Sequence, residues 1–162
     1  MALHILCEEP LRSKIDPETL LSLLPKICKE ACKGTDTSVK VLKIIIVFLN
    51  DISISSLIFQ MKALYFLSLI MKSVDNEYVV KNFLPSLKFI LENEKAPEVT
   101  MSVLGVYKAA ANSLGPEIIA TTIVPAIEPM LVDRSLSLQQ FELVLHLVQV
   151  IYYLFHANKI FH

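Results

Sequence analysis

The sequence predicts an all-α protein built as a stack of three to four helical hairpins. Apolar residues recur at helical spacing along nearly the whole chain, for example at Val80, Leu84, Leu87 and Leu91. No segment of the sequence shows the sustained alternation of polar and apolar residues that is typical of a strand. The 162 residues are 54% hydrophobic and 19% charged. This composition allows one domain with its own core and excludes a disordered chain.

Helix breakers divide the chain into eight predicted helices. Proline, glycine and aspartate residues interrupt the helical pattern at regular intervals. Asp16, Asp75 and Gly115 are expected N-caps, because each precedes an acidic residue that would lie in the positive first turn of a helix. The expected helices cover residues 2–8, 17–33, 36–50, 54–74, 77–94, 97–113, 117–132 and 136–156.

A proline-containing string recurs in three of these helices. It reads Leu24-Pro25-Lys26-Ile27, Leu84-Pro85-Ser86-Leu87 and Val124-Pro125-Ala126-Ile127. A proline inside a helix removes one backbone hydrogen bond and costs about 3 kcal/mol, so its recurrence indicates a bend that packing favours. A bent outer helix paired with an inner helix is the anatomy of HEAT-type repeats, which have a period of about 40 to 47 residues. The sequence therefore predicts a HEAT/armadillo-like α-solenoid over residues 1–162.

The spacing of the prolines contains an anomaly. The first two are 60 residues apart and the last two are 40 apart, and the excess equals about one helix. Because two expected inner helices, 36–50 and 54–74, would follow each other directly, we predict that an outer helix is missing near 51–53. The apolar face of the helix at 54–74 is expected to consist of Ile58, Met61, Leu64 and Tyr65.

Charge and cysteine content limit the classes of function. The net charge of −1 and the pI of about 6.4 give no basic field, so no nucleic-acid partner is expected. The sparse thiols Cys7, Cys28 and Cys32 fit a reducing, intracellular setting and are expected to be buried or half-buried, not to bind metal with His4. The start of the chain lacks the features of a signal peptide. No transmembrane span is expected, because the apolar run at 143–155 is shorter than the roughly 20 residues that a span needs.

Residues that could perform catalysis have simpler interpretations. His146 lies in an apolar run with no nucleophile motif nearby, which favours a packed or partner-facing histidine. Glu92, Glu94 and Glu98 surround a helix end and are expected in a solvated, charge-balanced loop. The chain is therefore expected to be no enzyme, with no catalytic, metal-binding or cofactor-binding residue. An all-helical enzyme that uses glutamate and histidine is the second alternative, and a deep polar pocket would favour it.

Two groups of residues are candidates for binding a partner. Three lysines recur at helical spacing and could meet acidic lipid headgroups or an acidic peptide, although an ordinary solvated face is the simpler interpretation. The last helix is apolar on nearly all sides, so following residues, a second copy of the chain or a partner protein should cover it. A concave wall of inner helices is the expected binding surface. The candidate residues are Lys26, Lys29, Lys33, Tyr152, Tyr153 and Phe155.

The C-terminal half of the sequence resembles a known family. The strings Val103-Leu104-Gly105-Val106-Tyr107-Lys108 and Leu136-Ser137-Leu138-Gln139-Gln140-Phe141 are the specific part of a similarity over residues 54–150. They resemble the HEAT-repeat region of the Scy-one-like pseudokinases, most of all that of the members associated with coated vesicles.

The resemblance implies a kinase-like domain N-terminal to the repeats in the same protein. It also implies a cytoplasmic scaffold, peripheral to Golgi, endosomal or clathrin-coated membranes, with coat or adaptor proteins as partners. The sequence itself contains no Gly-rich loop, no His-Arg-Asp catalytic loop and no Asp-Phe-Gly motif. A HEAT segment of an unrelated transport receptor or adaptor subunit is the first alternative.

Overall fold

The computed structural model is all-helical over the residues that it describes, which confirms the predicted all-α class. The structure describes residues 19, 22–23, 25–26, 35–49, 57–94 and 96–160. The helix expected over 2–8, most of the helix expected over 17–33, the N-cap expected at Asp16 and the junction at 51–53 lie outside the described residues.

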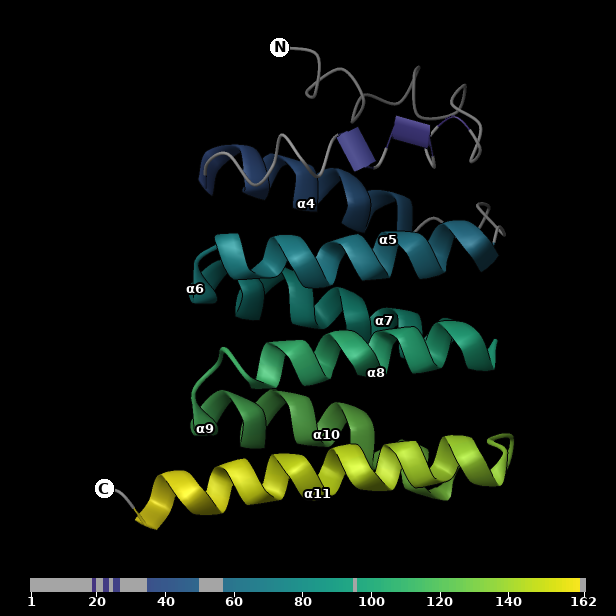
Figure 1. The fold of residues 1–162 in the computed structure, drawn as a ribbon, viewed down its shortest axis with the longest axis vertical. Coiled ribbons are helices and arrows are strands. Elements are labelled where there is room, and N and C mark those ends of the chain that lie inside the picture. Colours follow the sequence, from purple (N-terminus) through teal and green to yellow (C-terminus); the bar gives the residue numbers. More distant parts are fainter. Residues whose placement is uncertain are drawn as a thin grey trace.

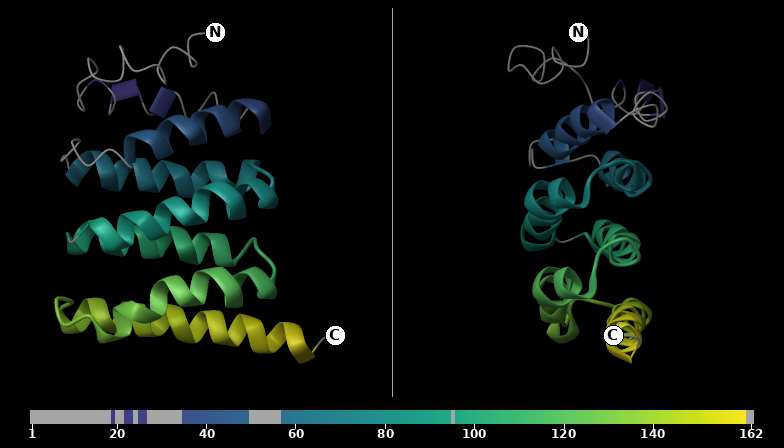
Figure 2. Two further views of the ribbon diagram at one scale, coloured as in Figure 1. Left: turned by 180° about the vertical axis from the view of Figure 1, so that it is seen from behind. Right: turned by 90° about the vertical axis from the view of Figure 1, so that its left-hand side faces the viewer.

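The helices form two parallel rows (Figures 1 and 2). The inner row consists of α5 (Leu57–Ile70), α8 (Pro97–Ala111) and α11 (Leu138–Ile160), which all run in the same direction. A 3₁₀ turn, η1 (Met71–Ser73), ends the first of these helices. Among the residues that the structure describes, the outer row contains two composite helices. The first consists of α6 (Asn76–Tyr78), η2 (Val79–Phe83) and α7 (Leu84–Asn93), and the second of α9 (Pro116–Ile118), η3 (Ile119–Ile123), α10 (Val124–Ile127) and η4 (Glu128–Val132).

The helix α4 (Thr35–Leu49) lies obliquely across the N-terminal end of the stack (Figure 2). It packs against α5 and η1. The sequence placed this segment among the inner helices, whereas the inner row itself consists of α5, α8 and α11. The missing outer helix near 51–53 stays a prediction, because that junction is outside the described residues.

Both composite helices contain a π turn directly before their proline string. The two π turns begin at Val79 and Ile119, which are 40 residues apart. In each turn the hydrogen bond spans five residues: the Leu84 N–H donates to the Val79 carbonyl, and the Val124 N–H donates to the Ile119 carbonyl. The wider turn makes room for the proline ring, which would collide with the carbonyl four residues earlier in a regular helix.

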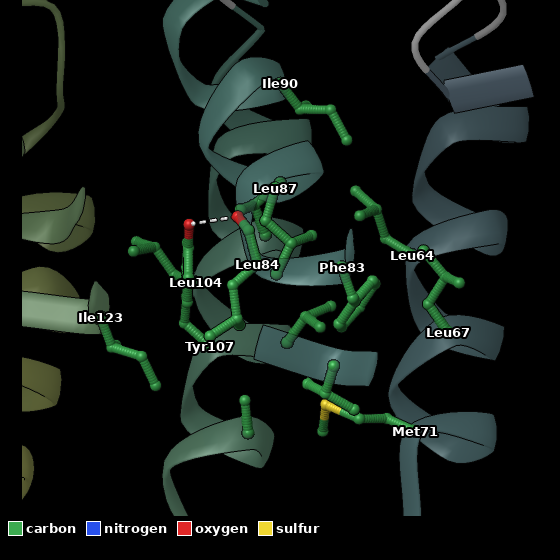
Figure 3. Close-up of a cluster of buried hydrophobic side chains, with 14 of the residues drawn as sticks. Leu64, Leu67, Met71, Phe83, Leu84, Leu87, Ile90, Leu104, Tyr107 and Ile123 are labelled. Atoms are coloured by element: carbon green, nitrogen blue, oxygen red, sulfur yellow. Dashed lines mark hydrogen bonds between the residues drawn. The ribbon is translucent and has the colours of Figure 1, made fainter. Parts of the chain in front are cut away.

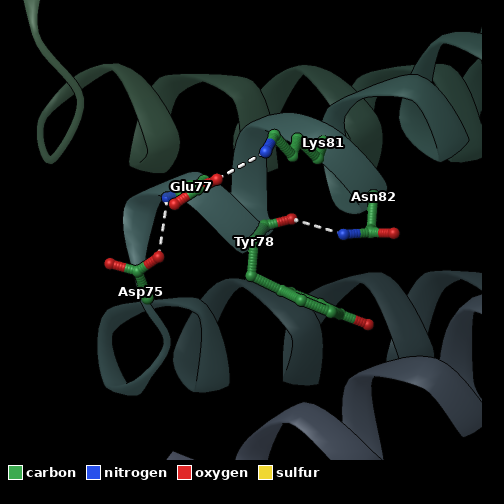
Figure 4. A network of polar contacts seen from close by, with 5 residues as sticks. All are labelled: Asp75, Glu77, Tyr78, Lys81 and Asn82. Carbon is green, nitrogen blue, oxygen red and sulfur yellow. Dashed lines mark hydrogen bonds and ion pairs between the residues drawn. The ribbon is translucent and has the colours of Figure 1, made fainter.

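The prolines themselves occupy a favourable position in the segment that follows. Pro85 and Pro125 lie in the first turn of α7 and of α10, where the lack of an N–H costs least. A side chain of the wide turn also donates a hydrogen bond to a backbone carbonyl. The Asn82 amide donates to the Tyr78 carbonyl at 3.3 Å (Figure 4). The expected bend thus takes the form of a π turn, which the proline pattern alone did not specify.

The N-termini of the two composite helices are capped as expected. The Asp75 carboxylate accepts a hydrogen bond from the Glu77 N–H at 3.1 Å, and Glu77 also pairs with Lys81 one turn later (Figure 4). Gly115 occupies the matching N-cap position of α9, and Glu117 lies in the first turn. Acidic side chains in these first turns interact favourably with the positive end of the helix dipole.

The core lies between the two rows (Figure 3). Leu64 and Leu67 of α5 face Phe83 of the outer row, and each of these three side chains is fully buried. Tyr107 of α8 is also fully buried, and its hydroxyl donates a 3.4 Å hydrogen bond to the Leu84 carbonyl. The side chains of α5 thus meet the composite helix that follows α5, whereas α8 contacts both the composite helix before it and η3 of the one after it, and α11 packs against the composite helix before it.

The apolar face expected for α5 is largely wrong. Leu64 is buried as expected, but Ile58 and Tyr65 are each 60% exposed and Met61 is 37% exposed. The reason is that α5 is apolar around its whole circumference, so its periodicity does not identify the side that faces the core. The buried side consists of Phe59, Gln60, Ala63, Leu64, Leu67 and Ile70.

Replacing Tyr107 with phenylalanine should change how stability depends on pH. Burial, and secondly the charge of Glu92, raise the pKa of the Tyr107 hydroxyl above its ordinary value of 10.0. Above that pH the unfolded chain loses this proton before the folded chain does. The free energy of unfolding of the unchanged protein therefore falls by about 1.4 kcal/mol per pH unit, and the variant lacks this contribution. The variant should lose only about 0.5 kcal/mol at neutral pH, because the hydrogen bond is long. Urea unfolding of both proteins at several alkaline pH values measures the slope, and equal slopes would contradict the expectation.

Candidate partner-binding surface

Four large apolar side chains form a ridge along the solvent side of α5. We call Ile58, Met61, Tyr65 and Leu69 the α5 ridge, and their exposed fractions are 60%, 37%, 60% and 45%. Their spacing keeps them on one face of the helix. Exposed apolar residues that occur singly are ordinary, but a contiguous group marks an interaction surface.

Lysines accompany this ridge, and acidic residues do not. Lys62 and Lys72 are exposed, and α5 together with η1 contains no aspartate or glutamate. Both lysines lie at helical spacing from Tyr65 and Leu69. This was the signal in the sequence that could have located the solvent side of α5, because lysine is almost never fully buried.

The 40-residue register relates the α5 ridge to the neighbouring helices of the inner row. Tyr65 corresponds to Gly105 on α8 and to Leu145 on α11. Gly105 is exposed, and a Cβ built on it would meet no atom within 4 Å. At this position α8 therefore has no side chain that projects into solvent. The helices on either side do: α5 bears Tyr65, and α11 bears Leu145, which is 38% exposed.

The aromatic residues predicted on the last helix lie at different positions. Tyr152 is 52% exposed and Tyr153 is 74% exposed, while Phe155 is half-buried. Tyr152 and Phe155 line a groove of about 270 Å³ between α11 and the outer row, together with Val124 and Pro125. Tyr153 is not among the residues that line it. A partner-binding role for these three residues stays a prediction.

One side of α11 is largely exposed where the corresponding side of α8 is buried. The register matches four buried positions of α8 with four positions of α11 that are exposed or half-buried. Two of the four are polar in α11, and one of these is the exposed His146. The interpretation of α11 as apolar on nearly all sides from 141 to 155, and the cover that it implies, stay predictions. The pairs are Val99 with Gln139, Val103 with Leu143, Val106 with His146, and Ala110 with Val150.

The predicted basic stripe is described at one position only. Lys26 is exposed. Lys29 and Lys33 lie outside the described residues, and so do His4 and the three cysteines.

The glutamates near the end of α7 have local structural partners. Glu94 accepts hydrogen bonds from the Gln60 amide at 3.2 Å and from the Ala96 N–H at 3.0 Å, and it thereby ties α5 to the turn before α8. Glu92 lies 3.9 Å from the Lys88 ammonium. Glu98 lies in the first turn of α8, where its charge is favourable. Each glutamate thus contributes to local structure.

The part of the chain that the structure describes contains no cluster of three or more metal-binding side chains. The outer row carries a surface hollow of about 320 Å³ between α7 and the second composite helix. Its lining includes Glu92 and Asp133, but Glu92 approaches Lys88 and the Asp133 carboxylate accepts the Ser135 N–H at 2.9 Å. The lining of this hollow contains no histidine, serine, threonine or cysteine.

By length and composition, α11 could cross a membrane. The stretch Leu138–Ala157 has a mean hydropathy of 1.2 over its best window, and 24% of that window is buried. One side of the helix packs against α8 and the outer row. A single such helix is weak evidence for a span, because the apolar helices of soluble proteins have the same composition. The expected absence of a span stays a prediction.

None of the known protein families, curated proteins or solved structures compared with the chain matches it.

Proposed function

We propose that this chain is a HEAT/armadillo-type helical-repeat scaffold that binds protein partners and performs no chemistry. The observation that carries the proposal is the pair of π turns placed 40 residues apart, each directly before a proline string. Stacked units of one design, each in contact with its neighbours, are the arrangement of solenoid proteins. Such proteins use the long surface of one helical row to bind other molecules.

The inner row is the proposed binding surface. It presents the α5 ridge, the open position at Gly105, and Leu145 and Tyr152 on α11. The large apolar side chains that the outer row exposes are Phe89, which is 38% exposed, and Val132, which is 81% exposed, and they lie on different composite helices. An apolar surface with lysines at its edge is suited to a protein partner, because aromatic and apolar side chains supply most of the energy of such interfaces.

The resemblance of residues 103–108 and 136–141 to the Scy-one-like pseudokinases supports a more specific proposal. In it the chain is the scaffold segment of a cytoplasmic trafficking protein whose kinase-like domain lies in the same polypeptide. Coat or adaptor components of clathrin-coated, Golgi or endosomal membranes are then the partners. A HEAT segment of an unrelated transport receptor or adaptor subunit would have the same repeats and different partners.

A capture experiment tests both levels of the proposal. The full chain is immobilised and exposed to cytosol, next to a variant with Ile58, Tyr65 and Leu69 changed to serine. We expect coat or adaptor components to bind the unchanged chain and to be lost from the variant. Phe89→Ser on the outer row is the matched control and should retain them.

Other outcomes decide against particular parts of the proposal. Recovery of nuclear-transport or other receptor cargo in place of coat components would favour the unrelated transport receptor. Failure to capture any protein would contradict the scaffold function, and capture that does not depend on the inner row would contradict the proposed binding surface.

A further inference from the structure

The structure points to a specific kind of partner: we propose that an amphipathic helix with acidic flanks binds lengthwise over α8, between the α5 ridge and α11. This inference rests on the proposed scaffold function and adds the partner's chemistry and its place. The inference rests on one arrangement: Gly105 lies in the middle helix, between two helices that bear large exposed apolar side chains.

The apolar part of the surface comes from the two flanking helices. Tyr65 and Leu69 are 60% and 45% exposed on α5, and Leu145 and Tyr152 are 38% and 52% exposed on α11. Tyr65 and Leu69 lie in the C-terminal half of α5, Leu145 and Tyr152 lie on either side of the middle of α11, and the two helices run in the same direction (Figure 1). The side chains of Tyr65, Leu69 and Leu145 would enclose the apolar stripe of a bound helix from both sides, and Tyr152 lies beyond Leu145 at the groove between α11 and the outer row.

The low centre of the surface comes from α8. Gly105 has no side chain, nothing lies within 4 Å of where its Cβ would be, and the next residue on that face is the small, half-buried Ala109. Packed neighbouring helices lie about 8–10 Å apart, so α5 and α11 are roughly twice that distance from each other. A helix with a diameter of about 10 Å fits between them. Glycine also permits a close approach of the bound backbone.

The charge on this surface selects an acidic partner. Lys62, Lys72 and Lys108 are exposed, and none of them forms an ion pair with a described residue. The acidic residues on the same side, Glu98 and Glu142, lie toward the N-terminal ends of α8 and α11. Carboxylates on the flanks of a bound helix would therefore meet the ammonium groups of Lys62 on α5, Lys72 on η1 and Lys108 near the C-terminal end of α8.

The acidic residues at the neighbouring edge of the stack do not neutralise these lysines. The Asp75 carboxylate caps α6, and Glu77 pairs with Lys81 (Figure 4). A lipid surface with negative headgroups would also attract lysines. It fits this surface less well, because a flat bilayer cannot reach a low centre between two ridges as a helix can.

The test uses the full chain and a displayed library of amphipathic helices with randomised flanking positions. We expect the selected peptides to have an apolar stripe and an excess of aspartate and glutamate on its flanks. Gly105→Leu should reduce their affinity about tenfold or more by filling the low centre. Because leucine favours a helix more than glycine does and has open space here, this variant should fold at least as stably as the unchanged chain.

Matched variants separate this surface from general effects. Lys108→Glu should weaken binding by a similar factor, whereas Lys88→Glu on the outer row should leave it unchanged. Tyr65→Ser should weaken binding, and Phe89→Ser should not. Circular dichroism and thermal unfolding of each variant verify that the fold is retained.

Several results would overturn the inference. These are selection of no peptide, selection of basic or neutral flanks, and binding that survives Gly105→Leu. Binding of the chain to phosphatidylserine vesicles that Lys108→Glu abolishes, with no peptide selected, would identify a membrane surface instead. A cytosolic partner that binds independently of the inner row would overturn this inference and the proposed binding surface, and would leave a scaffold that uses another surface.

Discussion

Replacing Phe83 with alanine is expected to lower the free energy of unfolding by about 3–5 kcal/mol. Phe83 ends the first π turn and is 0% exposed. It lies between Leu64 and Leu67 of α5 on one side and Leu84 on the other (Figure 3). Truncation would leave a cavity where the first two helical layers meet, and the close packing on both sides limits its collapse. Urea unfolding followed by circular dichroism measures the loss.

The control for this prediction is a phenylalanine of the same outer row. Phe89 is 38% exposed on α7. Its replacement with alanine should cost less than about 1 kcal/mol, because little buried volume is removed. Equal losses for the two variants would mean that the core between the rows is not where the structure places it.

Replacing Ile151 with alanine is expected to open α11 without unfolding the rest of the stack. Ile151 is 1% exposed and belongs to the last inner helix, which packs against the layer before it. The loss of about 2 kcal/mol or more should fall on that one interface, because each unit of a repeat stack interacts mainly with its neighbours. Amide hydrogen exchange in α11 should then accelerate about 30-fold or more, while α5 and α8 keep their rates.

The matched variant on the same helix is Tyr153→Ala. Tyr153 is 74% exposed, so its loss should leave exchange in α11 nearly unchanged. Mass spectrometry of deuterium uptake resolves the separate helices. Equal acceleration in α5, α8 and α11 after Ile151→Ala would mean that the chain unfolds as one cooperative unit, and this would count against the repeat-scaffold proposal.

Part of the candidate site could be predicted from the sequence, and part could not. The sequence predicts that Tyr152 and Tyr153 are open to a partner, because a last helix that is apolar on nearly all sides cannot bury all of its side chains against its neighbours. The sequence pattern places Ile58, Met61 and Tyr65 of the α5 ridge on the face toward the core, since apolar residues at helical spacing usually face inward. The role of Gly105 could not be predicted, because a glycine in a helix does not reveal whether the neighbouring helices bear exposed side chains on the same side.

The sequence by itself determined the helical class, the caps at Asp75 and Gly115, and the positions of the proline strings. These features depend on interactions within a few residues along the chain, such as an aspartate side chain that meets an N–H two residues later. Local chemistry of this kind is readable without knowledge of the neighbours.

Only the tertiary structure decided which side of α5 is buried, how α4 lies on the stack, and how the helix widens before Pro85 and Pro125. A helix that is apolar all round can bury any side, and the choice depends on the helices that pack against it. The proposed binding surface is a consequence of that choice. Packing of Phe59, Leu64 and Leu67 into the core leaves Ile58, Tyr65 and Leu69 in solvent.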